Sequence, residues 1–194
     1  MNPNTKKNIQ KFLYRYVNFT ELELAALASL VKVKHLKKNE LFVNEGEVAR
    51  HIAFTNKGYL RVYYNLDGEE ITRDITPLHS FATALPSFVS ESPSFEIIRA
   101  ITKCELIIIH KNDLEYLYAK YPNWERFGRK IIEEMFVESQ RRVYSFITEP
   151  AEERYKKLMK QYPDMIREIP LKYLADFIGI KLQSLSRLRK SMEW

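Results

Sequence analysis

The chain has a single cysteine and no long apolar run, and each of these shortages excludes a class of protein. A single cysteine, Cys104, cannot build a disulfide framework, a thiolate zinc site or a four-cysteine iron–sulfur cluster within one chain. No run of about 18 apolar residues occurs, and the first residues lack the apolar core of a secretory signal. We therefore expect a cytoplasmic protein that contacts no membrane.

Catalytic and metal-binding patterns are missing as well. The chain has no Ser-His-Asp spacing, no glycine-rich phosphate loop and no paired-carboxylate motif. A cupin-type metal site needs clustered ligands, and the histidines form no HxH or HxxxH pair. An axial haem ligand at His79 is a minor alternative, because a lone histidine in a loop is usually a plain surface residue. We expect no enzyme, no metal site and no cofactor. The four histidines are His35, His51, His79 and His110.

The composition indicates a folded chain, and its patterns predict an α+β fold. Of 194 residues, 45% are hydrophobic and 13% aromatic, enough to bury a core. A capping box, Thr20 with Glu23, opens a helix in "TELELAALASL". From Leu36 to His110, short β-rich runs alternate with polar turns, and "NLDG" reads as a hairpin turn. This spacing predicts an antiparallel β-roll or jelly roll.

Helical patterns follow the strands. Asn112 or Asp113 is expected to cap "LEYLYAKY", Pro122 interrupts the pattern, and a long helix is predicted from about residue 123 to 147. One apolar stripe of this helix recurs at alternating steps of four and three, which is typical of a coiled-coil seam. It predicts a dimerisation helix, although burial of both helix faces within one chain is an alternative. The seam residues are Ile132, Phe136, Ser139, Val143 and Phe146.

The opposite stripe, Phe127, Ile131 and Met135, is expected to pack on the strands. Pro150 then ends the long helix. We predict three parts: a β-roll sensor domain with flanking helices (1–122), the dimerisation helix (123–149) and a C-terminal DNA-binding domain (150–194). The formal net charge is +6, and residues 151–194 hold 10 Lys and Arg against 6 Asp and Glu.

The stretch "YLADFIGIKLQSLSRLRK" has the pattern of a helix-turn-helix. Ala175 supplies the small residue where two helices cross, Gly179 supplies the turn, and an apolar set pins the second helix. That inward set is Leu174, Ile178, Ile180, Leu185 and Leu188. A plain surface helix is the alternative. The residues left facing outward are donors suited to bases and phosphates, and we predict that they bind DNA. They are Lys181, Gln183, Ser184, Ser186, Arg187, Arg189 and Lys190.

Taken in order, the β-roll, long helix and "IPLKYLADFIGIKLQSLSRLRK" resemble the cyclic-AMP receptor protein and FNR (Crp/Fnr) family of bacterial transcription regulators, over roughly residues 20–190. The glycines of "NEGE" and "NKGYLRVYY" support the resemblance more weakly. It implies that Gln183 and Arg187 read bases and that Ser184 contacts a phosphate. Leu182 departs from the arginine that family members use there, so the operator sequence is expected to differ.

The resemblance weakens where the family binds a cyclic nucleotide. Thr83-Ala84 and Ser94-Phe95 stand where family members have Gly-Glu and Arg-Ser, which hold the ribose and the cyclic phosphate. A desolvated phosphate without its guanidinium is costly, so we expect no cyclic-AMP binding. Phenylalanines could fill the pocket or line a site for an apolar effector. The expected pocket residues are Phe81, Thr83, Ala84, Leu85, Ser94, Phe95 and Arg99, with Phe88 and Pro86 beside them.

These patterns predict a homodimeric regulator that binds a near-palindromic operator in double-stranded DNA. RNA polymerase and an unknown small-molecule effector are candidate further partners. The alternative is a non-enzymatic ligand-binding or scaffold protein that uses the helix-turn-helix for protein contacts.

Overall fold

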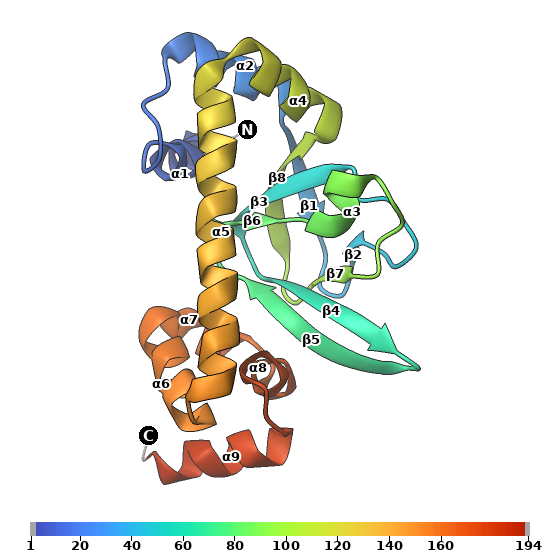
Figure 1. Cartoon of the computed structure of the whole chain (residues 1–194), viewed down its shortest axis with the longest axis vertical. Helices are drawn as coiled ribbons and strands as arrows, with labels where there is room; N and C mark the ends of the chain where they lie inside the picture. Colours follow the sequence, from blue (N-terminus) through green and yellow to red (C-terminus); the bar gives the residue numbers. More distant parts are fainter. Residues whose placement is uncertain (1–2, 193–194) are drawn as a thin grey trace.

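Two four-stranded antiparallel sheets form a β-roll beside one long helix (Figure 1). The structure, a computed structural model, describes residues 3–192. The first sheet has the order β1 (Lys32–Leu36), β8 (Cys104–His110), β3 (His51–Lys57) and β6 (Phe81–Ala82). The second sheet has the order β2 (Leu41–Val43), β7 (Ile97–Ala100), β4 (Leu60–Leu66) and β5 (Glu69–Thr76). The predicted antiparallel roll is confirmed.

The β4–β5 hairpin turns where "NLDG" predicts it. Asp67 and Gly68 both have positive φ, 52° and 90°, and Leu66 pairs with Glu69 across the two-residue loop. Two successive positive φ values define a turn whose twist matches that of the flanking strands. Asn65 accepts a hydrogen bond from the Gly68 amide at 3.1 Å, which closes the turn from outside.

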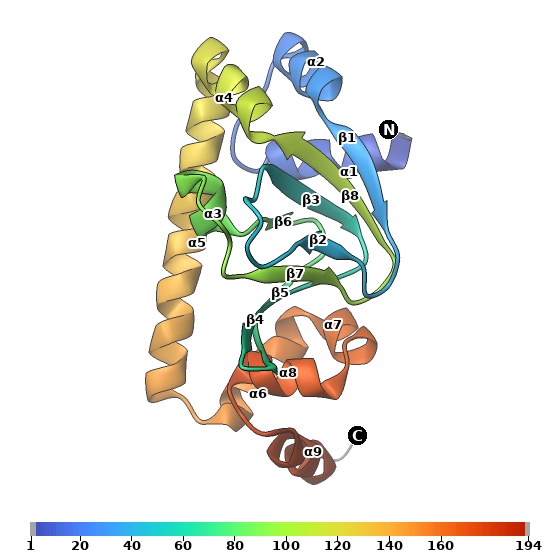
Figure 2. The same ribbon diagram turned by 90° about the vertical axis from the view of Figure 1, so that its right-hand side faces the viewer.

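The helices near the N-terminus cover the outer face of the first sheet (Figure 2). The Thr20–Glu23 capping box opens α2 (Glu21–Leu30) as predicted. The amphipathic helix α1 (Pro3–Leu13) was not predicted, and β1 begins at Lys32, four residues before the predicted start of the strands. The predicted cap of α4 (Lys111–Lys120) is wrong: His110 caps it, because its Nδ1 accepts a hydrogen bond from the Asn112 amide at 3.1 Å.

Prolines lie at or just before the start of four helices in the C-terminal half. Pro122 occupies the first turn of α5 (Pro122–Thr148), where its missing N–H costs nothing. Pro150 and Pro170 stand just before α6 (Ala151–Gln161) and α8 (Leu171–Ile178), and Pro163 begins α7 (Pro163–Glu168). The remaining helices are α3 (Leu85–Ser90), between β6 and β7, and α9 (Leu182–Ser191). Within residues 3–192, no helix combines the length and apolar character needed to cross a membrane.

Three apolar clusters hold these elements together. The first fills the roll between the two sheets and includes Ala84 and Phe88. The second joins the outer face of the first sheet to α1, α2, α4 and the start of α5, and it includes Phe127. The third joins the C-terminal helices to Tyr59 and Ile75 of the roll, so the roll and the C-terminal helices share buried side chains.

Candidate DNA-binding surface and sensor region

The turn between α8 and α9 depends on Gly179. Its φ of +75° and ψ of 38° lie in the left-handed region, and the Ile180 amide donates to the Ala175 carbonyl oxygen at 3.0 Å. Glycine reaches this conformation without steric cost. A methyl group at Gly179 would also lie 2.5 Å from Cε1 of Phe146, so the phenyl ring of α5 covers the turn.

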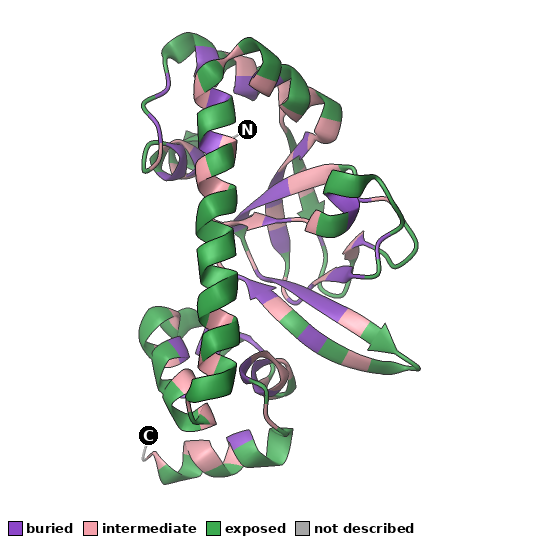
Figure 3. Ribbon diagram, in the orientation of Figure 1, coloured by how far each residue is buried: buried purple, intermediate pink, exposed green. Residues whose placement is uncertain are grey.

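Apolar residues fix α9 against α8. Leu174, Ala175 and Leu185 are fully buried, and Ile178 is nearly so. They pack with Tyr155 of α6 in the third cluster. Because these side chains point inward, the opposite face of α9 is left to solvent (Figure 3).

That face carries the predicted DNA-binding side chains. Lys181, Gln183, Ser184, Arg187 and Lys190 are exposed, whereas Ser186 and Arg189 are half-buried. Lys181 is the N-cap residue of α9, and its side chain accepts no hydrogen bond from the first turn. The first turn also holds no acidic residue. The positive end of the helix dipole therefore faces outward together with a lysine, an arrangement that favours an anion.

Two arginines tie α8 to its neighbours. Arg154 of α6 donates through Nε and Nη2 to the Ile178 carbonyl oxygen, at 3.0 and 2.9 Å. Arg142 of α5 donates through Nη2 to the carbonyl oxygens of Phe177 and Arg73, at 2.8 and 2.9 Å. Cations at the carbonyl end of a helix stabilise its dipole. These contacts place the turn of the motif against the end of α5.

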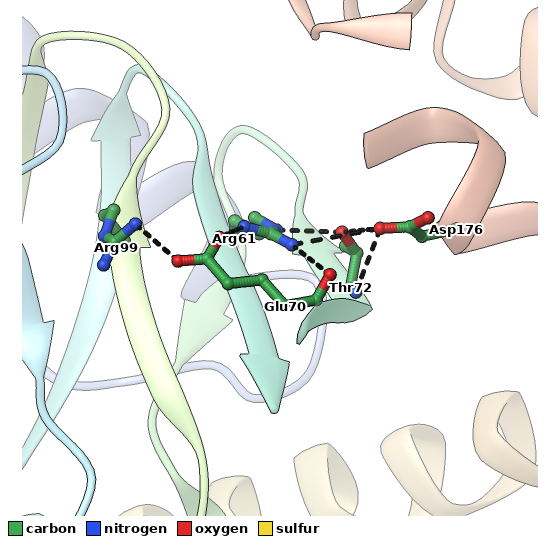
Figure 4. A network of polar contacts seen from close by, with 5 residues as sticks. All are labelled: Arg61, Glu70, Thr72, Arg99 and Asp176. Atoms are coloured by element: carbon green, nitrogen blue, oxygen red, sulfur yellow. Dashed lines mark hydrogen bonds and ion pairs between the residues drawn. The ribbon is translucent and has the colours of Figure 1, made fainter. Parts of the chain in front are cut away.

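A partly buried polar network joins α8 to the β4–β5 hairpin (Figure 4). The Arg61 side chain, 2% exposed, donates through Nε to Thr72 Oγ1 at 2.8 Å and through Nη1 to Glu70 Oε2 at 2.5 Å. Asp176 Oδ2 accepts hydrogen bonds from the Thr72 hydroxyl and amide, at 3.0 and 3.3 Å. Arg99 completes the network with Glu70 Oε1 at 3.0 Å.

Charge and stacking stabilise this network. The Arg61 guanidinium lies over the rings of Tyr63 and Tyr173, 4.2 and 4.0 Å from their centroids. Burial acts to raise the pKa of Glu70, but hydrogen bonds and charge from Arg61 and Arg99 hold it below its usual value. Glu70 is therefore ionised at neutral pH. The sequence gives no signal for this network, because its members are spread over three strands and a distant helix.

The predicted seam of α5 is exposed over most of its length (Figure 3). Ile132, Phe136 and Val143 are 48%, 63% and 52% exposed, and Ser139 is exposed beside them. Phe146 is exposed by 39% and also contacts the turn at Gly179. On the opposite stripe, which was expected to pack on the strands, Phe127 is buried and Ile131 half-buried, but Met135 is 42% exposed.

The seven predicted pocket residues do not come together in one pocket. Ala84 is buried inside the roll, where Phe88 also packs. Phe81, Thr83 and Leu85 instead line a cavity on the outer face of the first sheet. Arg99 belongs to the Glu70 network, and Phe95 is half-exposed, with its ring stacked on Tyr64 at 6.0 Å. Ser94 is buried, and its hydroxyl bonds the backbone of Glu96.

Glu96, which the sequence reasoning missed, changes the chemistry of this region. Its side chain is 4% exposed and pairs with Arg73 Nε at 2.8 Å, and its Oε2 has no hydrogen-bond partner among residues 3–192. Burial raises the pKa of Glu96, Arg73 lowers it and Asp74 raises it further; the net shift is upward. The buried group two residues from Ser94 is therefore a carboxyl already paired with Arg73, and not a free cation that could hold a phosphate.

The structure defines the surroundings of two histidines and of Cys104. His51 and His110 pair across β3 and β8 with ring centroids 5.0 Å apart, a proximity the sequence spacing does not reveal. Over residues 3–192, no group of three or more potential metal ligands is close enough to hold an ion. Cys104 is buried, and that burial raises the pKa of its thiol to about 11. It is therefore protonated and a poor nucleophile at neutral pH.

Comparisons with known proteins agree with this architecture. Residues 33–121 match the cyclic nucleotide-binding domain family. No curated protein sequence matches the chain. Among solved structures, FixK2 from Bradyrhizobium japonicum is similar with a TM-score of 0.69 and 16% identity, covering 84% of each chain. The catabolite activator protein of Thermus thermophilus gives a TM-score of 0.57 and 16% identity, covering 93% of this chain and 86% of the other.

A protein from Eubacterium rectale, assigned to the Crp/Fnr family of transcriptional regulators, gives a TM-score of 0.67 and 15% identity, covering 93% of this chain and 86% of its own. The similarity to these three structures extends over 84–93% of this chain, which includes the β-roll, the long helix and C-terminal helices. Residues 33–121 therefore form a cyclic nucleotide-binding-type domain, and the chain as a whole has the fold of the Crp/Fnr transcription regulators.

Proposed function

We propose that this protein is a cytoplasmic, non-enzymatic transcription regulator that binds DNA as a homodimer. The observation that carries the proposal is the exposed cationic face of α9, held by a buried apolar face and a left-handed glycine turn. In a helix-turn-helix protein, the second helix enters the major groove and its N-terminal residues meet the base edges. Gln183 and Arg187 are placed on that face.

The roles of the side chains follow from their hydrogen-bonding capacity. Arg187 can pair bidentately with guanine, and Gln183 with adenine, which gives base preference. Lys181, Ser184 and Lys190 suit phosphates, which position the helix without reading sequence. Ser186 and Arg189 lie at the edge of the same face and are half-buried. Leu182, 41% exposed between Lys181 and Gln183, offers an apolar contact to a thymine methyl group.

The exposed apolar stripe of α5 supports a homodimer. Phe136 and Val143 are 63% and 52% exposed, and burying the part that remains exposed favours association by about 1 kcal/mol each. A symmetric pair would hold two α9 helices for half-sites about 34 Å apart, so the operator would be a near-palindrome. RNA polymerase is a candidate further partner of this dimer.

The sensor region supports a protein that does not respond to cyclic AMP. Ser94 and Phe95 supply no cation for a phosphate, and the nearby Glu96 is a buried carboxyl that already engages Arg73. Ala84 gives no carboxylate for a ribose hydroxyl. If an effector exists, its chemistry differs from that of a cyclic nucleotide.

Arg187→Ala tests the base-reading role. A DNA fragment selected from random duplexes should bind the variant about 5- to 150-fold more weakly, equivalent to about 1–3 kcal/mol, with preference lost at one base position. Lys190→Ala should weaken selected and random fragments alike. Lys160→Ala, an exposed lysine of α6, is the charge-matched control and should bind as the native protein does.

Fluorescence anisotropy at fixed salt measures all three variants, because affinity for DNA depends strongly on salt. Equal losses on selected and random DNA would contradict a base-reading Arg187. Failure of the native protein to prefer any duplex would favour the alternative, a scaffold that uses α8 and α9 for protein contacts.

A further inference from the structure

An apolar cavity of about 90 Å³ lies outside the β-roll, between the outer face of the first sheet and the helices that cover it. Phe54 and Ile107 form its floor on β3 and β8, and Ile9 of α1, Leu114 of α4 and Ile131 of α5 form its walls. The side chains that fill the roll belong to a different cluster on the other face of this sheet. The cavity is therefore separate from the place where the fold would hold a cyclic nucleotide.

The lining carries no charged residue. Its polar groups are few: the indole N–H of Trp124 already donates to the Glu23 carbonyl oxygen at 3.3 Å, and the Thr83 hydroxyl donates to the His51 carbonyl oxygen at 3.0 Å. Burial raises the pKa of the Tyr118 phenol to about 12, so this group is neutral as well. A charged ligand would lose its hydration here without gaining a partner.

We propose that this cavity binds a compact, uncharged, apolar molecule no larger than about one aromatic ring. An apolar cavity of about 150 Å³ in another protein remains dry and binds benzene or xenon, which sets the scale for a site of this size. Ile132 and Met135 also line the cavity and are 48% and 42% exposed, so the cavity reaches solvent along α5. A ring that extends slightly beyond the closed volume would find room at this end.

The exposed end of the cavity lies beside the predicted dimer seam of α5. Ile131 and Ile132 are adjacent on α5, and Ile132 belongs to the predicted dimer seam. A bound molecule would therefore contact the same turn of helix that faces a second copy. An effect on operator affinity rests on the proposed function above, whereas binding of the small molecule does not.

Benzene is the probe, and isoleucine-methyl NMR of the full chain is the measurement. Ring currents should shift the methyl signals of Ile9, Ile107 and Ile131 with a saturable dependence on benzene, and the melting temperature should rise. Ile98 inside the roll and Ile178 of α8 do not line the cavity and should be unaffected. Benzoate, which has the same ring and a negative charge, should shift none of these signals.

Val31→Phe and Val137→Phe form a matched pair. Val31 lines the cavity, so its enlargement should abolish the benzene response, whereas Val137 of α5 is 44% exposed and is not a lining residue, so its enlargement should leave the response intact. The proposal is overturned if benzene shifts no lining methyl of the native protein, if all isoleucines shift alike, or if a folded Val31→Phe still responds. Should Val31→Phe fail to fold, the native titration decides the question by itself. If the native protein binds benzene but prefers no DNA duplex, only the proposed function is overturned.

Discussion

At the scale of single residues, Gly179 shows how one position serves both backbone and packing. Its φ of +75° costs any other L-residue about 1–2 kcal/mol, and the ring of Phe146 occupies the space where a Cβ would lie. Gly46 offers a matched comparison: its φ is +79°, but no atom lies within 4 Å of an added Cβ. A residue with a Cβ would therefore be strained about equally at both positions, and only at Gly179 would it also clash with a neighbour.

Gly179→Ala should therefore destabilise the protein more than Gly46→Ala does. We expect about 1–2 kcal/mol for Gly46→Ala, from strain, and roughly a further 1–3 kcal/mol for Gly179→Ala, because Phe146 must move. Urea unfolding at neutral pH measures both changes in the free energy of unfolding. If both variants lose the same free energy of unfolding, the Phe146 ring moves aside without cost and does not support the turn.

Glu96 should make stability depend on pH. Because burial raises its pKa in the folded state above the ordinary value of 4.5, the folded protein binds this proton more tightly than the unfolded chain. The stabilisation is complete below about pH 4.5 and is lost as the pH rises through the higher folded pKa. Glu96→Gln cannot titrate, so its free energy of unfolding, relative to that of the native protein, should rise across this window. If the difference in free energy of unfolding between the two proteins stays constant from pH 4 to 8, the pKa of Glu96 is not raised by folding.

At the scale of elements, local sequence signals were sufficient where one segment decides its own structure. The Thr20–Glu23 box, the "NLDG" turn and the helix-starting Pro122 act within a few residues, and each lies where the sequence predicts it. The helix α1 and the short strand β6 were missed, because they are stabilised by packing and pairing with distant segments. The His110 cap was missed because histidine is an uncommon N-cap residue.

The candidate sites divide in the same way. The inward face of the helix-turn-helix follows from helical periodicity, which the structure reproduces in the buried Leu174, Ala175 and Leu185. The sequence did not show which residues of the sensor region share a pocket, because successive side chains of a strand point to opposite faces of the sheet. Alternation of side chains sends Phe81 to the outer cavity and Ala82 to the interior of the roll.

The helix α5 has two apolar stripes, and the predicted seam is exposed along most of its length, whereas Phe127 and Ile131 of the other stripe are covered. Phe136→Glu places a charge at the centre of the exposed seam and should convert a dimer into a monomer, because an unpaired carboxylate would be buried between two copies. Val137→Glu is the control: the side chain is 44% exposed and lies about 100° around the helix from Phe136. Sedimentation velocity should give a monomer for the first variant and a dimer for the second. Dimers of both would place the interface elsewhere.

At the scale of the whole molecule, the C-terminal helices are fixed to the roll by more than the chain connection through α5. The third cluster buries Tyr59 and Ile75 of the roll among α6 to α9, and the Arg61 network reaches Asp176 across the same boundary (Figure 4). Asp176 lies in the last turn of α8, where a carboxylate is opposed by the helix dipole. Its position is therefore explained by the contacts with Thr72 rather than by α8 itself.

Asp176→Ala should loosen α8 from the β4–β5 hairpin. The Thr72 amide and hydroxyl would lose their shared acceptor, and the buried Arg61 would lose a nearby charge, at a cost of about 1–3 kcal/mol in the free energy of unfolding. Hydrogen exchange at the Thr72 amide should accelerate. Asp164→Ala breaks an exposed pair with Arg167 and should cost less than about 1 kcal/mol, with no change at Thr72. Because α9 follows α8 directly through the Gly179 turn, unchanged exchange at Thr72 in Asp176→Ala would mean that the hairpin does not set the position of α8 and α9.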